Sequence, residues 1–141
     1  MTRPRLAVQA LVLAVAAGLS ASTILQGVGP HDEGLMLSWA NRIAGGQWPY
    51  RDFWCNYAPG QPLVLAGLVK LFGPSLLSWR VLRSAIDAVT ALLAYRLARR
   101  DAGEPVALLA ALAVAGAMAF PTGPGPTPPA LLLALGALLA A

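Results

Sequence analysis

Residues 30–62 have the sequence PHDEGLMLSWANRIAGGQWPYRDFWCNYAPGQP, which differs sharply in composition from the segments on either side. This stretch holds three of the six acidic residues, three of the four tryptophans, two of the three tyrosines, and the single cysteine and histidine. Both flanks are rich in alanine, leucine and valine. A polar, aromatic loop of this length is longer than a simple connection requires, and such loops usually carry function.

The composition predicts a membrane protein. The chain of 141 residues is 57% hydrophobic and 11% charged, whereas ordinary soluble domains are about 25% charged. The net charge of +4 comes from basic residues scattered beside apolar runs, so we expect topology signals and no nucleic-acid partner. A single cysteine, Cys55, excludes an internal disulfide framework.

Four apolar runs predict an all-α fold, a polytopic transmembrane bundle. The expected spans are residues 6–28, 76–99, 105–120 and 129–141, with an outer loop over 29–75. The first run is about 34 Å long as a helix, enough for a hydrocarbon core of about 30 Å. Basic residues before it and after the second run predict a multi-pass protein of the cell membrane with a cytoplasmic N-terminus. A cleaved secretory signal peptide is the alternative for the first run.

The outer loop is expected to contain two short interfacial helices. Residues 34–44 place Leu35, Trp39 and Ile43 on one helical face. Such a helix can lie in the membrane interface with Trp39 at the depth of the headgroups. Residues 63–72 form a second helix, about 15 Å long, which cannot span.

The acidic pair Asp32–Glu33 stands at the start of the first of these helices. In a structural interpretation, Asp32 caps the helix and Glu33 favours its positive end. In a catalytic interpretation, a carboxylate there is held ionised and oriented, as a general base must be. The residues alone leave both open. His31 precedes the pair, but three consecutive side chains diverge, so we expect no metal site.

Three charged residues recur along one face of the next helix, which Ser75 is expected to cap. Arg83 and Asp87 have the spacing of an ion pair within the bundle. Arg80 stands near the outer end, where a guanidinium offers paired donors to a lipid phosphate. A purely structural anchor is the equal alternative for Arg80.

The order of motifs resembles a known family. After the first apolar run come, in order, Asp-Glu-Gly at 32–34, Gly-x-x-Pro-Tyr-Arg-Asp-Phe at 46–53, Pro-Gly-x-Pro at 59–62, Leu-Phe-Gly at 71–73 and an arginine early in the next helix. This order, over about residues 6–100, resembles the N-terminal part of membrane glycosyltransferases of the GT-C fold. The most similar group is the bacterial protein O-mannosyltransferases and aminoarabinose-transferase-like enzymes.

The resemblance implies transfer of a sugar from a polyprenyl-phosphate-linked donor to an acceptor on the outer face of the cytoplasmic membrane. It implies that Asp32 is the catalytic base, that Glu33 helps to place the acceptor, and that Arg80 faces the donor phosphate. It implies contact with membrane lipids and no cofactor besides the lipid-linked donor. Family members are several times longer, so we expect an N-terminal fragment that is inactive alone. A non-catalytic membrane scaffold or transporter piece is the alternative.

Overall fold

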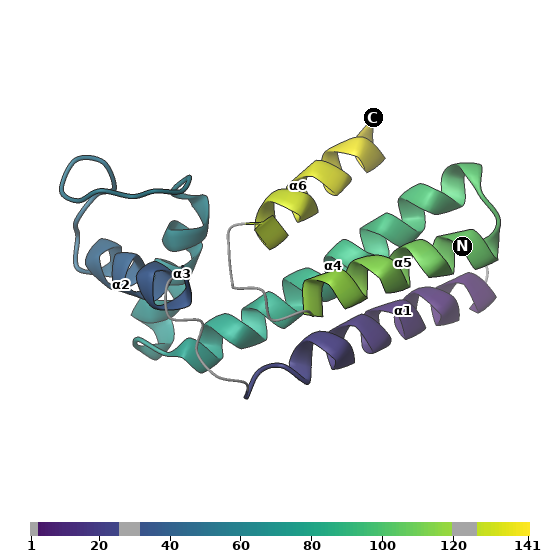
Figure 1. The fold of residues 1–141 in the computed structure, drawn as a ribbon, viewed down its shortest axis with the longest axis horizontal. Helices are drawn as coiled ribbons and strands as arrows, with labels where there is room; N and C mark the ends of the chain where they lie inside the picture. The colour runs from purple at the N-terminus through teal and green to yellow at the C-terminus, as the bar shows by residue number, and fades with distance from the viewer. Residues whose placement is uncertain (1–2, 26–31, 120–126) are drawn as a thin grey trace.

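The computed structural model describes residues 3–25, 32–119 and 127–141, and the regular structure of these parts is α-helical (Figure 1). The helices are α1 (Arg3–Ala21), α2 (Asp32–Ala44), α3 (Gly60–Phe72), α4 (Leu76–Asp101), α5 (Glu104–Ala119) and α6 (Thr127–Ala140). The all-α part of the predicted fold is therefore confirmed.

Helix α4 is the element on which the others assemble. It has 26 residues, and α1, α5 and α6 pack against it, while α2 and α3 pack on each other near its N-terminal end (Figure 1). It begins as predicted at Ser75, whose hydroxyl oxygen accepts the backbone N–H of Ser78 at 3.3 Å. A short turn then leads into α5, which carries Pro105 in its first turn, where a missing N–H is tolerated.

The contact between α1, α4 and α5 is lined by very small side chains. Its centre consists of Ala16, Ala88, Ala91 and Ala115, all at most 5% exposed. Toward the N-terminal end of α1 it continues through Val12, Leu92, Tyr95, Ala107 and Ala111. Alanine projects a single methyl group, which allows helices to pack closely, but a groove of about 260 Å³ lies between α1 and α5 beside Ala16 and Ala115.

A second core lies between α2, α3, the loop that joins them and the start of α4. It consists of Met36, Trp39, Ala40, Phe53, Cys55, Leu65, Ala66 and Trp79. Trp39 is 5% exposed and packs edge-on against Tyr57, with ring centroids 6.1 Å apart. The expectation that Trp39 lies at headgroup depth is therefore wrong. Leu35 and Ile43, expected on the same face, are only partly buried.

The predicted transmembrane bundle is also wrong. Across the described residues, no helix combines the length and the apolar character that crossing a bilayer demands. Helices α5 and α6 have 16 and 14 residues, or about 24 and 21 Å, against a hydrocarbon core of about 30 Å. Helix α4 is long enough, but charged residues recur along it, among them Arg80, Arg83, Asp87 and Arg96.

The multi-pass location in the cell membrane, with its cytoplasmic N-terminus, depended on those four spans and is corrected with them. The sequence interpretation treated residues 6–28 as one apolar helix, whereas α1 ends at Ala21 and is followed by a turn. Residues 26–28 of that predicted span lie outside the described residues. Counting apolar residues overestimated the length of α1 alone, since α4, α5 and α6 are at least as long as the spans predicted for them.

Candidate functional site

Two of the three predicted site residues meet in a buried ion pair. Nε of Arg80 donates to Oε1 of Glu33 at 2.8 Å, and Nη2 of Arg80 donates to Oε2 at 2.8 Å. The side chains are 14% and 6% exposed. The pair thus has the paired geometry that makes guanidinium–carboxylate contacts strong and directional, and it joins the first turn of α2 to the first turns of α4.

The positions of Glu33 and Arg80 near helix N-termini favour their pairing. Glu33 is the second residue of α2, where the positive end of the helix dipole favours a carboxylate. Arg80 is near the N-terminus of α4, where the same effect disfavours a cation. Bonding to Glu33 offsets that penalty and raises the pKa of Arg80, with burial acting in the opposite direction. Arg80 also donates through Nη1 to the backbone carbonyl of Ile24, beyond the end of α1.

Asp32, the predicted base, is the first residue of α2 and directly precedes Glu33. The backbone therefore places it beside the Glu33–Arg80 pair and at a helix N-terminus. Its side chain lies outside the described part of the chain, as does His31. Neither the predicted cap by Asp32 nor its predicted catalytic role is tested.

A second polar cluster lies one to two turns further along α4. Nε of Arg83 donates to Oδ1 of Asp87 at 3.2 Å, which confirms the predicted pair. The hydroxyl of Ser20 on α1 donates to Oδ2 of Asp87 at 2.6 Å. Asp87 is 2% exposed, so both of its carboxylate oxygens are satisfied inside the bundle. Nη2 of Arg83 also donates to the carbonyl of Met118 on α5, at 3.3 Å.

Sequence analysis missed Ser20 as a partner of Asp87. The available signal was its position as a hydroxyl within an otherwise apolar segment. A buried hydroxyl without a partner is unfavourable, so such a residue predicts an acceptor on a neighbouring helix. Spacing along the chain could not identify that acceptor, because 67 positions separate the two residues.

The loop between α2 and α3 is held by charged side chains. Asp52 accepts the backbone N–H of Trp48 at 2.7 Å and pairs with Arg51 at 2.7 Å. These contacts, with the bond to Arg51 the largest contribution, lower the pKa of Asp52 to about 2. The guanidinium of Arg42 lies 4.6 Å from the ring centroid of Phe53, as a cation–π contact. The loop therefore has a defined shape beside the second core.

Cys55 and Gln61 are both buried, but they differ in whether their polar groups have a hydrogen-bond partner. The thiol of Cys55 is 2% exposed and donates to the carbonyl of Tyr57 at 3.1 Å. The side-chain amide of Gln61 is buried, and neither its oxygen nor its nitrogen has a partner among the described residues. The indole N–H of Trp79 is also buried and has no hydrogen-bond partner among the described residues. Sequence analysis singled out neither Gln61 nor Trp79.

In the described ranges, no group of histidine, cysteine, aspartate and glutamate side chains is placed to hold a metal ion. The carboxylates of Glu33 and Asp87 bind arginine and serine side chains. At the start of α2, the carboxylate of Glu33 holds the guanidinium of Arg80 in a fixed orientation.

Comparison with known proteins found no matching family model, no similar curated protein and no similar solved structure. The description of the chain as a membrane glycosyltransferase therefore gains no support from known proteins, and its transmembrane part is wrong. The chemistry that the resemblance implies for Asp32, Glu33 and Arg80 remains a hypothesis about these residues.

Proposed function

We propose that the chain takes part in sugar transfer from a polyprenyl-phosphate-linked donor, with its reacting groups around the start of α2. The observation that carries the proposal is the Glu33–Arg80 pair, with two bonds of 2.8 Å between segments that are 47 positions apart. It fixes a guanidinium next to the helix end on which Asp32 stands. A phosphate-binding cation beside a candidate base is what such a reaction needs.

In the proposed reaction, the carboxylate of Asp32 accepts the proton of an acceptor hydroxyl. The hydroxyl oxygen then attacks the anomeric carbon from the face opposite the phosphate. The bond between the anomeric carbon and the phosphate oxygen breaks, and the configuration inverts. Arg80 stabilises the negative charge of the departing polyprenyl phosphate.

Glu33 has a positioning role in this scheme. Its carboxylate holds the Nε edge of the guanidinium, so the orientation of Arg80 is set before a donor arrives. A preoriented cation stabilises developing charge without reorganising at the moment of reaction. Glu33→Gln should therefore weaken both donor binding and transfer.

Donor binding and transfer provide separate tests. Farnesyl phosphate, a short soluble probe, should bind the chain in isothermal titration calorimetry and should lose about tenfold or more in affinity in Arg80→Gln. Arg51→Gln, which removes an exposed arginine that is 69% accessible, is the matched control and should bind normally. Because the chain is expected to be inactive alone, transfer is measured in a longer chain that supports it, with polyprenyl-phosphate mannose and a hydroxyl acceptor. Asp32→Asn should abolish transfer there without changing the far-UV circular dichroism. Retained transfer in Asp32→Asn would remove Asp32 from the mechanism.

A non-catalytic scaffold is the second candidate, and the burial of the Glu33–Arg80 pair favours it. Both oxygens of Glu33 bond to Arg80, and the side chain is only 6% exposed, as expected of a clamp that holds α2 on α4. If Arg80→Gln destabilises the fold while farnesyl phosphate shows no binding to the unmodified chain, the scaffold is the correct function.

A further inference from the structure

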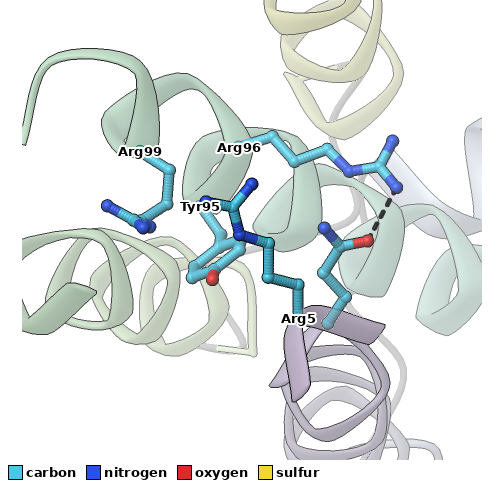
Figure 2. A pocket seen from close by; sticks show the side chains of 5 residues that line it. Arg5, Tyr95, Arg96 and Arg99 are labelled. Carbon is cyan, nitrogen blue, oxygen red and sulfur yellow. Dashed lines mark hydrogen bonds between the residues drawn. The ribbon is translucent and has the colours of Figure 1, made fainter. Parts of the chain in front are cut away.

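At the far end of α4 from the Glu33–Arg80 pair, three arginines line one pocket. The pocket has a volume of about 320 Å³ and is lined by Arg5, Gln9, Tyr95, Arg96 and Arg99. Figure 2 shows Arg5 reaching from α1 toward Tyr95, while Arg96 and Arg99 extend to either side of it from α4. Its size lies at the lower end of the range of about 300–1,000 Å³ that is usual for small-molecule sites.

The charges around this pocket are unbalanced. Three guanidinium groups line it, whereas one nearby carboxylate, Glu104, pairs with Arg99 at 2.9 Å and accepts the hydroxyl of Tyr95 at 2.6 Å. Arg100, on the same turn of α4, donates to the carbonyls of Leu138 and Leu139 on α6. Two of the three positive charges in the pocket therefore have no carboxylate partner among the described residues.

The helix dipoles account for only part of this arrangement. Arg99 and Arg100 lie in the last turn of α4, where the negative end of the dipole favours cations. Arg5, however, is the third residue of α1, at the positive end of that helix. The guanidinium of Arg5 thus lies in the same pocket as two other guanidinium groups and at an unfavourable helix end. An anion in the pocket would offset both effects.

Arg5 and Arg96 are the groups available to such an anion. Both side chains are exposed. Arg5 makes no hydrogen bond or ion pair with any residue that the structure describes, and Arg96 donates through Nη2 to the side-chain oxygen of Gln9 at 2.9 Å (Figure 2). A guanidinium suits a phosphate group, because its planar fork matches two phosphate oxygens.

We propose that this pocket binds a phosphate monoester, with Arg5 and Arg96 as its main contacts and Gln9 as a further donor. A phosphate group fills only part of the volume, which leaves space for the organic group that carries it. The site is separate from the one proposed for sugar transfer, since the helical rise from Arg80 to Arg96 is about 24 Å. A lipid headgroup or a free metabolite can present the same phosphate.

The test is calorimetric titration of the whole chain at low ionic strength with two probes, glycerol 3-phosphate and phosphatidylcholine vesicles containing phosphatidic acid. One or both should bind, and the double variant Arg5→Gln/Arg96→Gln should bind about tenfold or more weakly. Arg51→Gln also replaces an arginine by a neutral side chain, but outside the pocket, and it should bind both probes as the unmodified chain does. Binding of glycerol 3-phosphate identifies a soluble ester, and binding of the vesicles alone identifies a lipid headgroup.

A second measurement uses the unmodified chain and needs no variant. In NMR spectra, the side-chain Nε–H signals of Arg5 and Arg96 should shift as the bound probe is added, and that of Arg51 should not. The proposal is overturned if neither probe binds, if the double variant binds as tightly as the unmodified chain, or if the Arg5 and Arg96 signals stay unchanged. Farnesyl phosphate is itself a phosphate monoester and can enter this pocket, so the two sites are told apart by variant. Loss of its binding in Arg80→Gln but not in Arg5→Gln/Arg96→Gln reports the site proposed for sugar transfer, and the opposite pattern reports this pocket.

Discussion

The Glu33–Arg80 pair should dominate the attachment of α2 to α4, and a double-mutant cycle measures this directly. Glu33→Gln keeps the shape of the side chain but leaves the guanidinium of Arg80 facing a neutral amide. The two lost charge-assisted bonds are each 2.8 Å long, and the side chains are 6% and 14% exposed. Removing one partner of a buried pair costs about 3–5 kcal/mol. Because Arg80 keeps its bond to the carbonyl of Ile24, we expect about 3 kcal/mol.

Arg80→Met should lower the free energy of unfolding by a similar amount, because it leaves the carboxylate of Glu33 buried without its cation. The double variant removes both charges, and exchange of both partners is often far less harmful than loss of one. The coupling energy between the two positions should therefore reach about 2–3 kcal/mol. That is a large part of the stability of a small domain, about 5–15 kcal/mol.

The assay is urea unfolding at pH 7, followed by far-UV circular dichroism, for the unmodified chain, both single variants and the double variant. Arg51→Met, at an arginine whose side chain is 69% exposed, is the matched control and should shift the midpoint far less. Single variants with unaltered midpoints would contradict the reasoning. Additive effects of the two substitutions would do so as well, since they would show that the residues do not interact.

Three further predictions concern other polar groups. Asp87→Asn should lower the free energy of unfolding by about 3 kcal/mol in urea titrations, because Arg83 then lacks its buried carboxylate; an unchanged midpoint would contradict this. Gln61→Met should raise it by about 1 kcal/mol, because the buried amide has no partner in the described structure; a decrease would reveal a partner. The carboxyl of Asp52 should titrate at about pH 2 in carbon NMR. Because the pKa of Asp52 is lowered from 3.8, its ionised carboxylate contributes fully to stability well above pH 3.8, and this contribution is lost as the pH falls toward 2. Arg51→Gln should raise the pKa of Asp52.

Local features of the fold were predictable from the sequence. Ser75 caps α4 because a serine hydroxyl can reach the backbone N–H three residues later. Arg83 and Asp87 pair because four residues bring side chains together on one helical face. The helix at the start of the loop was expected over residues 34–44 and begins two residues earlier, at Asp32. These outcomes depend on neighbouring residues alone.

Long-range contacts were not predictable in the same way. Glu33 and Arg80 were both candidates, but nothing in their spacing showed that they bond to each other. The membrane prediction was wrong for a related reason. Alanine-rich helices satisfy a hydropathy count whether they face lipid or each other, and the α1, α4 and α5 contact uses alanine to bring backbones together.

The alanines between α1, α4 and α5 also limit how this part of the protein can change. A core of large side chains can accommodate a substitution through new rotamers and compensating replacements nearby. Alanine has no rotamers to adjust, so one extra carbon at Ala91, which has no exposed surface, should be accommodated only by shifts of the surrounding backbone and side chains, at a cost of about 1–3 kcal/mol. Substitutions should therefore be tolerated unevenly: poorly at the alanine contact between α1, α4 and α5, and better in the core around Met36 and Trp39.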